Sequence, residues 1–218
     1  RDDSGAASGI DIDSDTLIEL AEHPNCFGAK VSRLASEFFW RGGSRSCLRQ
    51  LTCGNVGKGS RLAAHTQSKE YLSRHAPFQV LPGFSDIMYP GMVVGMTGSI
   101  TGTGGPVKMS ILISQALNIE SSGNIIPKTI VKLYNAAAKA IATGDREATA
   151  EALDLHRRVA AADWIVVKAG ISGTKLALDK WVEAGLGGVP RKPLPRSTDE
   201  TVRLVESLRP FWEFESTL

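Results

Sequence analysis

The chain has 218 residues, of which 42% are hydrophobic and 22% charged, and its formal net charge is +2. This balance is typical of a globular protein with one sizeable core, and it gives no reason to expect a nucleic acid or a membrane as partner. No apolar stretch approaches the roughly 20 residues of a membrane-spanning helix. The chain starts at Arg1 without a signal core or an initiating methionine. We therefore expect a cytoplasmic protein, with the mitochondrion as the alternative compartment, and a true N-terminus upstream of Arg1.

The cysteines and histidines do not form a metal-binding pattern. Three cysteines without CxxC spacing favour free thiols in a reducing compartment over a disulfide framework. The four histidines are scattered without metal-ligand spacing: His23, His65, His75 and His156. We expect them in solvent-exposed or helix-capping positions, and we predict no metal site.

The first half of the chain alternates between helix and strand patterns. Asp13, Ser14 and Asp15 supply the N-cap of a helix that ends before His23. The pattern then predicts a strand over 25–30, a helix over 60–74, a strand over 78–81, a helix over 86–94 and a strand over 98–101. Short apolar strands separated by helices predict the α/β class with parallel strands.

The C-terminal third contains helix patterns and no strand pattern. A helix is predicted from Pro127 to Gly144, and two more are predicted over 146–167 and 174–184. A fourth is expected to start at a capping box formed by Ser197 and Glu200 and to end near Pro210. Together these segments predict a helical extension on an α/β unit.

Lys30 is the main catalytic candidate, because it closes the predicted strand over 25–30. A lysine that an apolar strand presents at the mouth of a barrel can lose its charge through desolvation and become a nucleophile near neutral pH. Such an amine forms Schiff bases with carbonyl compounds. The alternative is an ordinary surface lysine at a strand end.

Two segments, near 31–50 and 105–123, interrupt this order of elements. Lys30, Val31 and Ser32 can be encoded by AAG followed by GTGAGT, a strong splice donor, and Gln50 can be encoded by CAG, a strong acceptor. We predict that both segments are retained introns. The alternative is a pair of surface loops, which folds tolerate.

Outside these segments the chain resembles the dihydrodipicolinate synthase and N-acetylneuraminate lyase superfamily. The resemblance is strongest to its fungal 4-hydroxy-2-oxoglutarate aldolase-like and 2-keto-3-deoxy-galactonate aldolase-like branch. The matching segments are 23–30 (HPNCFGAK), 51–58 (LTCGNVGK), 80–83 (VLPG), 95–100 (GMTGSI), Asn124 with Pro127, 171–175 (ISGTK) and 187–194 (GGVPRKPL).

This resemblance implies the fold. The family forms a TIM (β/α)₈ barrel with its active site at the carboxyl ends of the strands. The chain would contain the last three strands of such a barrel and a C-terminal helical extension. We expect residues 1–127 to form the partial barrel, with its inserts, and residues 128–218 to form the last barrel helix and the extension.

The resemblance also implies a Schiff-base aldolase that cleaves or forms a carbon–carbon bond, with pyruvate as one partner. The other compounds would be 4-hydroxy-2-oxoglutarate or a 2-keto-3-deoxy sugar acid. Lys30 would be the catalytic amine, and Gly83 and Ile100 fall where the family places backbone groups beside the keto acid. No cofactor is implied, and the complete protein would be a homotetramer.

Parts of the family pattern are absent. The tyrosine motif that precedes the matching segment is replaced by Arg1 to Ser4, and the earlier glycine–threonine loop is missing. Where dihydrodipicolinate synthases place a carboxylate-binding arginine, this chain has Ala6 or Ala7. We therefore predict that the chain as written is inactive. The alternatives to an aldolase are an inactive truncated fragment of one and a dihydrodipicolinate synthase-like enzyme.

Overall fold

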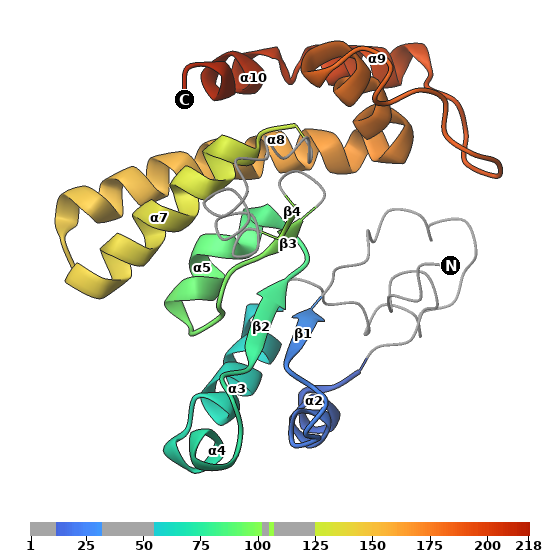
Figure 1. Ribbon diagram of the computed structural model, residues 1–218. Helices are drawn as coiled ribbons and strands as arrows, with labels where there is room; N and C mark the ends of the chain where they lie inside the picture. Colours follow the sequence, from blue (N-terminus) through green and yellow to red (C-terminus); the bar gives the residue numbers. More distant parts are fainter. Residues whose placement is uncertain (1–11, 32–54, 102–104, 107–124) are drawn as a thin grey trace, which may run out of the picture. The chain divides into compact units, whose positions relative to one another are not determined.

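The computed structural model describes residues 12–31, 55–101, 105–106 and 125–218 (Figure 1). The chain divides into two compact units, residues 1–100 and residues 101–218. The predicted inserts lie outside the described residues, except for Val31, Gly105 and Pro106. Ala6, Ala7 and Asn124 also lie outside them.

The first unit alternates helices and strands as the sequence predicts. Its elements are α2 (Ser14–Ala21), β1 (Gly28–Val31), α3 (Val56–Thr66), α4 (Lys69–Arg74), β2 (Gln79–Pro82), η3 (Ser85–Ile87) and α5 (Met88–Val93). Two short strands, β3 (Ile100–Thr101) and β4 (Gly105–Pro106), follow and form a two-stranded sheet. The helix predicted over 86–94 therefore begins as the 3₁₀ turn η3.

Polar side chains start the first three helices. The side chain of Asp13 accepts the backbone N–H of Thr16 at 2.8 Å, as predicted, and Asn55 caps α3 in the same way. Ser68 accepts the N–H of Tyr71 at 3.1 Å and starts a new helix. The single helix predicted over 60–74 was therefore wrong, because this cap ends α3 and begins α4.

The first sheet of the described residues consists of β1 and β2, which are parallel. Gly28 pairs with Gln79, Lys30 with Leu81 and Val31 with Pro82. The predicted parallel arrangement is confirmed for this pair. Because the two strands run in the same direction and end in register, their carboxyl ends lie at one edge of the sheet.

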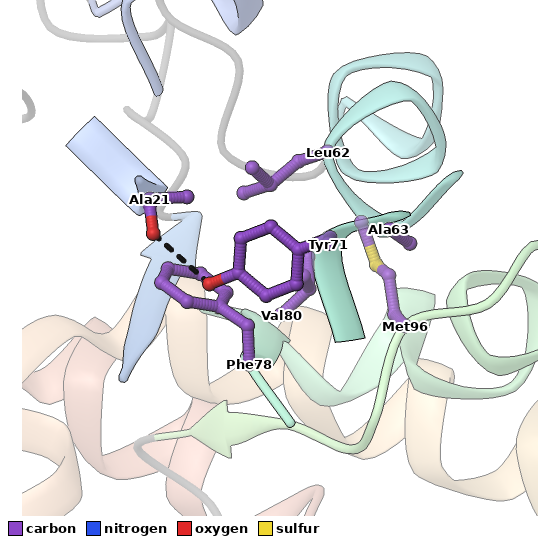
Figure 2. Close-up of a cluster of buried hydrophobic side chains, with 7 residues drawn as sticks. All are labelled: Ala21, Leu62, Ala63, Tyr71, Phe78, Val80 and Met96. Atoms are coloured by element: carbon purple, nitrogen blue, oxygen red, sulfur yellow. Dashed lines mark hydrogen bonds between the residues drawn. The ribbon is translucent and has the colours of Figure 1, made fainter. Parts of the chain in front are cut away.

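A buried cluster fixes the helices against this sheet (Figure 2). Its members are Ala21, Leu62, Ala63, Tyr71, Phe78, Val80 and Met96. Tyr71 is only 1% exposed, and its hydroxyl donates a 2.9 Å hydrogen bond to the carbonyl of Ala21. Each large apolar side chain of this kind contributes about 1.5–3 kcal/mol by leaving water. The cluster therefore holds α2, α3 and α4 to β2.

The second unit is helical over residues 125–218. Its helices are α7 (Pro127–Thr143), α8 (Arg146–Ala177), the π-helix η4 (Leu178–Val182), α9 (Asp199–Glu206) and α10 (Arg209–Ser216). The predicted start and end of α7 are confirmed: Pro127 lies in its first turn, and Gly144 follows in the left-handed conformation with φ 65°.

Two helices are predicted over 146–167 and 174–184, and the break between them is confirmed: inside α8, Gly170 has a non-helical backbone with φ 63° and ψ −165°. The second of these helices continues beyond Ala177 into η4. The last helices differ from prediction in two places. The capping box of α9 uses Thr198 and Thr201 rather than Ser197 and Glu200. The hydroxyl of Ser197 donates to the carbonyl of Ser172 at 3.2 Å. Pro210 lies in the first turn of α10, so the predicted helix end there was wrong.

In the part of the chain that the structure describes, no helix is both long and apolar enough to cross a membrane.

Candidate active site

The carboxyl edge of the β1–β2 sheet brings two predicted site residues to the same end. Lys30 is the third residue of β1 and pairs with Leu81 in β2. Gly83 follows the last residue of β2 directly. For Lys30 the structure describes the backbone. The parallel register therefore places the backbones of Lys30 and Gly83 at the edge where parallel α/β folds carry their active sites.

Hydrogen bonds from the backbone of Thr97 and from the hydroxyl of Ser99 bring the third predicted residue, Ile100, to this end. The backbone N–H of Thr97 donates to the carbonyl of Val80 at 2.9 Å, and the N–H of Val80 donates to the hydroxyl of Thr97 at 3.1 Å. Two residues further along, the hydroxyl of Ser99 lies within hydrogen-bonding distance of carbonyls at the end of β2. Ile100 follows Ser99 in the chain, so it too lies near the carboxyl end of β2.

Sequence reasoning missed Thr97 and Ser99. The signal for them is in the segment 95–100 (GMTGSI), where two hydroxyl residues alternate with other residues. In an extended segment, residues two apart point to the same side. Thr97 and Ser99 can therefore both face β2, and the structure confirms that both do.

Lys58 is a second lysine in the first unit, and its amine is already bound. Its side chain is 5% exposed, and Nζ donates a 2.6 Å hydrogen bond to the carbonyl of Ile12. Next to it, the guanidinium of Arg61 donates to the hydroxyl of Ser14 at 2.8 Å. These contacts tie the start of α3 to the start of α2.

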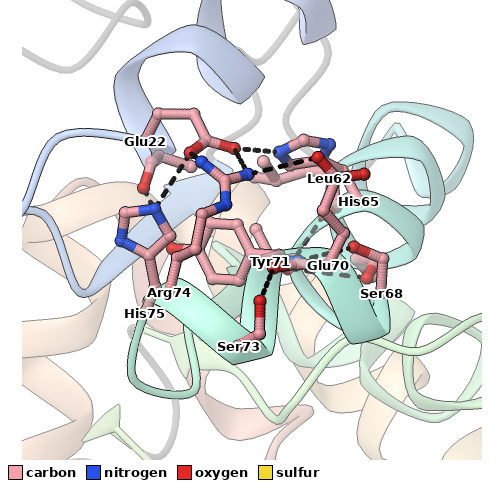
Figure 3. Close-up of polar contacts among 12 residues, drawn as sticks. Glu22, Leu62, His65, Ser68, Glu70, Tyr71, Ser73, Arg74 and His75 are labelled. Atoms are coloured by element: carbon pink, nitrogen blue, oxygen red, sulfur yellow. Dashed lines mark hydrogen bonds and ion pairs between the residues drawn. The ribbon is translucent and has the colours of Figure 1, made fainter.

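A polar cluster forms around the carboxylate of Glu22, the residue that follows α2 (Figure 3). The carboxylate of Glu22 bonds Nε2 of His65 at 2.8 Å and Nε2 of His75 at 2.9 Å. Arg74 donates to the same carboxylate at 2.9 Å. The hydrogen bond from His65 has the largest effect on the pKa of Glu22 and lowers it. Burial, the second-largest effect, opposes this, and the hydrogen bond from His75 and the positive charge of Arg74 lower the pKa further.

This cluster corrects one sequence-based interpretation. His65 and His75 are not isolated surface residues, because both bind Glu22 across more than forty positions of sequence. His23 has the predicted local role: its Nδ1 accepts the N–H of Asn25 at 3.2 Å. In the described ranges, no group of three or more His, Cys, Asp and Glu is arranged to hold a metal ion.

No family model matches the chain. It is 32% identical over 215 residues to an L-threo-3-deoxy-hexylosonate aldolase of Hypocrea jecorina. The alignment covers 98% of this chain and 53% of that protein. The chain is a homologue of this fungal aldolase. It is also 28% identical to a protein of Emericella nidulans named a probable mitochondrial 4-hydroxy-2-oxoglutarate aldolase, over 98% of this chain and 52% of that one. These two names confirm the resemblance to fungal aldolases that the sequence motifs indicate.

Solved structures show the same fold. A dihydrodipicolinate synthase family protein of Coccidioides immitis superposes with a TM-score of 0.61 and 24% identity, over 95% of this chain and 53% of that one. A prophage protein of the dihydrodipicolinic acid synthase family from E. coli, in complex with pyruvate, gives a TM-score of 0.60 and 16% identity over the same shares. The chain thus superposes on about half of this family's fold, and it spans about half the length of the curated relatives it matches.

Proposed function

We propose that the chain is part of a Schiff-base aldolase. This enzyme cleaves or forms a carbon–carbon bond in 2-keto acids, and pyruvate is one of the compounds that it splits off or joins. The observation that carries this proposal is the position of Lys30 near the carboxyl end of β1, beside β2, in a homologue of fungal keto-acid aldolases. The substrate class follows the names of the relatives, 3-deoxy-hexylosonate and 4-hydroxy-2-oxoglutarate aldolase.

In the proposed reaction the neutral amine of Lys30 attacks the 2-keto carbon of the substrate. The resulting carbinolamine loses water and becomes a protonated imine, which accepts the electron pair released when the bond between the third and fourth carbons breaks. The fourth carbon leaves as the carbonyl carbon of an aldehyde, once the proton of its hydroxyl has been removed. The remaining enamine takes up a proton, and water then hydrolyses the imine to pyruvate and the free lysine.

Gly83 and Ile100 serve this reaction through their backbones. Both lie at the carboxyl end of β2, the first directly after the strand and the second next to Ser99. Neutral peptide dipoles at this place orient the keto acid without competing with the positive charge of the imine. No cofactor is needed in this scheme.

The fold proposal is a partial barrel. Residues 1–127 would supply the last three strands of a TIM barrel, and residues 128–218 the last barrel helix and a helical extension. Support comes from the parallel β1–β2 pair and from the superposition on family members. We further propose that the complete protein is a homotetramer. Two relatives are named mitochondrial, and on this ground we propose the mitochondrion, the alternative compartment, ahead of the cytoplasm.

A second candidate is a chain that does not catalyse by itself. In the described residues β1 pairs on one side only, with β2. An open strand edge and a partial barrel leave inner side chains without partners. A displacement of about 1 Å in such a site lowers the rate on the order of a hundredfold.

Pyruvate and borohydride distinguish the two candidates. The reagent reduces an imine to a stable amine, and peptide mass mapping locates it. An aldolase gives an adduct on Lys30 that disappears in Lys30→Ala and persists in Lys69→Ala, which removes an exposed lysine of the same unit. Absence of any adduct on the wild-type chain would reject catalysis by this chain and support the second candidate.

A further inference from the structure

The hydroxyl of Ser99 lies between two carbonyl groups that flank Gly83. Its oxygen is 3.2 Å from the carbonyl oxygen of Pro82 and 3.0 Å from that of Phe84. Ser99 is fully buried, with 0% of its surface exposed. A hydroxyl has a single proton, so its donor is shared between the two carbonyls or alternates between them.

The backbone of β2 explains why a side-chain donor is needed there. Gln79 donates to Phe27 at 2.9 Å, so it faces the β1 side. Backbone groups alternate between the two sides along a strand, so Val80 and Pro82 face the opposite side, where Thr97 binds Val80. Pro82 has no N–H, and the segment beside it can bond only to its carbonyl. The hydroxyl of Ser99 supplies that bond and reaches one turn residue further, to Phe84.

We propose that Ser99 is a positioning residue for the keto-acid site. It holds the two carbonyls on either side of Gly83, and it is joined by a peptide bond to Ile100. One buried hydroxyl thus sets the spacing between the two backbone segments that contact the substrate in the proposed function, on which this inference rests. Ser99 does not touch the substrate; it acts through Gly83 and Ile100.

The effect of Ser99→Ala follows from this geometry. The carbonyls of Pro82 and Phe84 lose the hydroxyl of Ser99, and the turn after β2 is held less firmly to the segment that leads into β3. The turn then opens more often, and pyruvate must restore the order when it binds. Binding therefore weakens, while the reactivity of the amine, once pyruvate is bound, stays the same.

Two readouts test the proposal on the full chain. The first is hydrogen exchange of the amides of residues 83–87 without pyruvate, which we expect to be about tenfold faster in Ser99→Ala. The second is borohydride trapping at increasing pyruvate concentration. We expect the half-saturating concentration to rise about three- to tenfold, with the maximal fraction of trapped Lys30 unchanged. A purely structural loss would instead lower the trapped fraction.

Thr97→Val is the matched control, because it removes a hydroxyl that binds Val80, three residues before Gly83, and keeps the backbone bond from the N–H of Thr97 to the carbonyl of Val80 that holds this segment to β2. We expect the amide of Val80 to exchange its hydrogen faster. The amides of residues 83–87 should exchange at the wild-type rate, and the half-saturating pyruvate concentration should equal that of the wild type. Where Ser99→Ala does not fold, Ser99→Cys keeps a group of similar size with a weaker donor and gives the same changes to a smaller extent. Unchanged exchange and half-saturation in the Ser99 variants overturn the proposal. If the wild-type chain traps no pyruvate, the proposed function fails for this chain, and the exchange measurement alone decides whether Ser99 holds the turn.

Discussion

The carboxylate of Glu215 accepts two hydrogen bonds from Thr129, one from its backbone N–H at 2.7 Å and one from its hydroxyl at 2.6 Å. Its other oxygen accepts the N–H of Lys128 at 2.7 Å. The residue before α7, Ile126, makes no capping bond with its side chain. Glu215 on α10 therefore caps α7 from a distant part of the sequence, and its negative charge lies at the positive end of the helix dipole.

Replacing Glu215 should destabilise the second unit strongly. Glu215 is 3% exposed, so Glu215→Ala leaves two backbone N–H groups and a hydroxyl without their acceptor in a buried place. We expect a loss of about 3 kcal/mol in the free energy of unfolding, measured by urea denaturation. Glu213→Ala removes an exposed glutamate of the same helix and should change it by less than about 0.5 kcal/mol. Equal urea midpoints for the two variants would contradict this role.

The order of most elements could be predicted from the sequence because its signals are local. Asp13 at the start of α2 and Gly144 after α7 have the side chain or the backbone freedom that a cap needs, and both act as predicted. The start of α9 could not be resolved in this way. Ser197 and Thr198 are both capping residues, and only the tertiary contact of Ser197 with Ser172 decides between them.

The candidate site was predictable only in part. Lys30 closes a predicted strand, whereas Gly83 and Ile100 were implied by the family resemblance. The parallel register places the backbones of Lys30 and Gly83 at one end of the sheet, and the bonds of Thr97 and Ser99 to β2 bring Ile100 near it. The alternation of Thr97 and Ser99 is a local signal, but the partners of the Ser99 hydroxyl lie 15 and 17 residues away, and no local pattern indicates which groups they are. Hydrogen bonds between residues so far apart in sequence depend on how the chain folds, so they can be identified only from the structure.

The carboxylate of Glu22 gives a specific pH dependence. Its hydrogen bonds from His65, His75 and Arg74 lower its pKa below the ordinary value of 4.5. A carboxylate with a lowered pKa in the folded state stabilises the fold fully above 4.5, and this contribution is lost as pH falls through the folded-state pKa. Glu22→Gln should therefore lower the urea midpoint at neutral pH, and the difference from wild type should vanish in acid.

Glu70→Gln is the control for this experiment. Glu70 is 85% exposed in its side chain and approaches Arg74 only to 3.8 Å. We expect the urea midpoint of Glu70→Gln to differ little from that of the wild type at every pH. A Glu22→Gln difference that stays constant from neutral pH to below pH 3.5, about one unit under the ordinary value, would show that the charge of Glu22 does not stabilise the fold.

The side chain of Met96 fills the space beside two helical glycines, Gly59 in α3 and Gly91 in α5. A Cβ atom on Gly59 would overlap the terminal methyl group of Met96, Cε, and would lie 3.0 Å from its Sδ; a Cβ atom on Gly91 would lie 2.6 Å from Sδ. Alanine in a helix is favoured over glycine by about 1 kcal/mol, but this contact opposes the gain. We expect Gly59→Ala to destabilise the wild-type chain by about 1–3 kcal/mol.

In a Met96→Ala background the sulfur and the methyl group are absent, and the same Gly59→Ala change should be neutral or stabilising by up to about 1 kcal/mol. Met96 is 4% exposed, so Met96→Ala alone should cost about 2–5 kcal/mol through the cavity that it leaves. The new Cβ of the double variant occupies part of that cavity, which adds to the favourable coupling. Urea denaturation of all four chains measures this coupling, and strict additivity of the two changes would show that Met96 moves away from Gly59 at no cost.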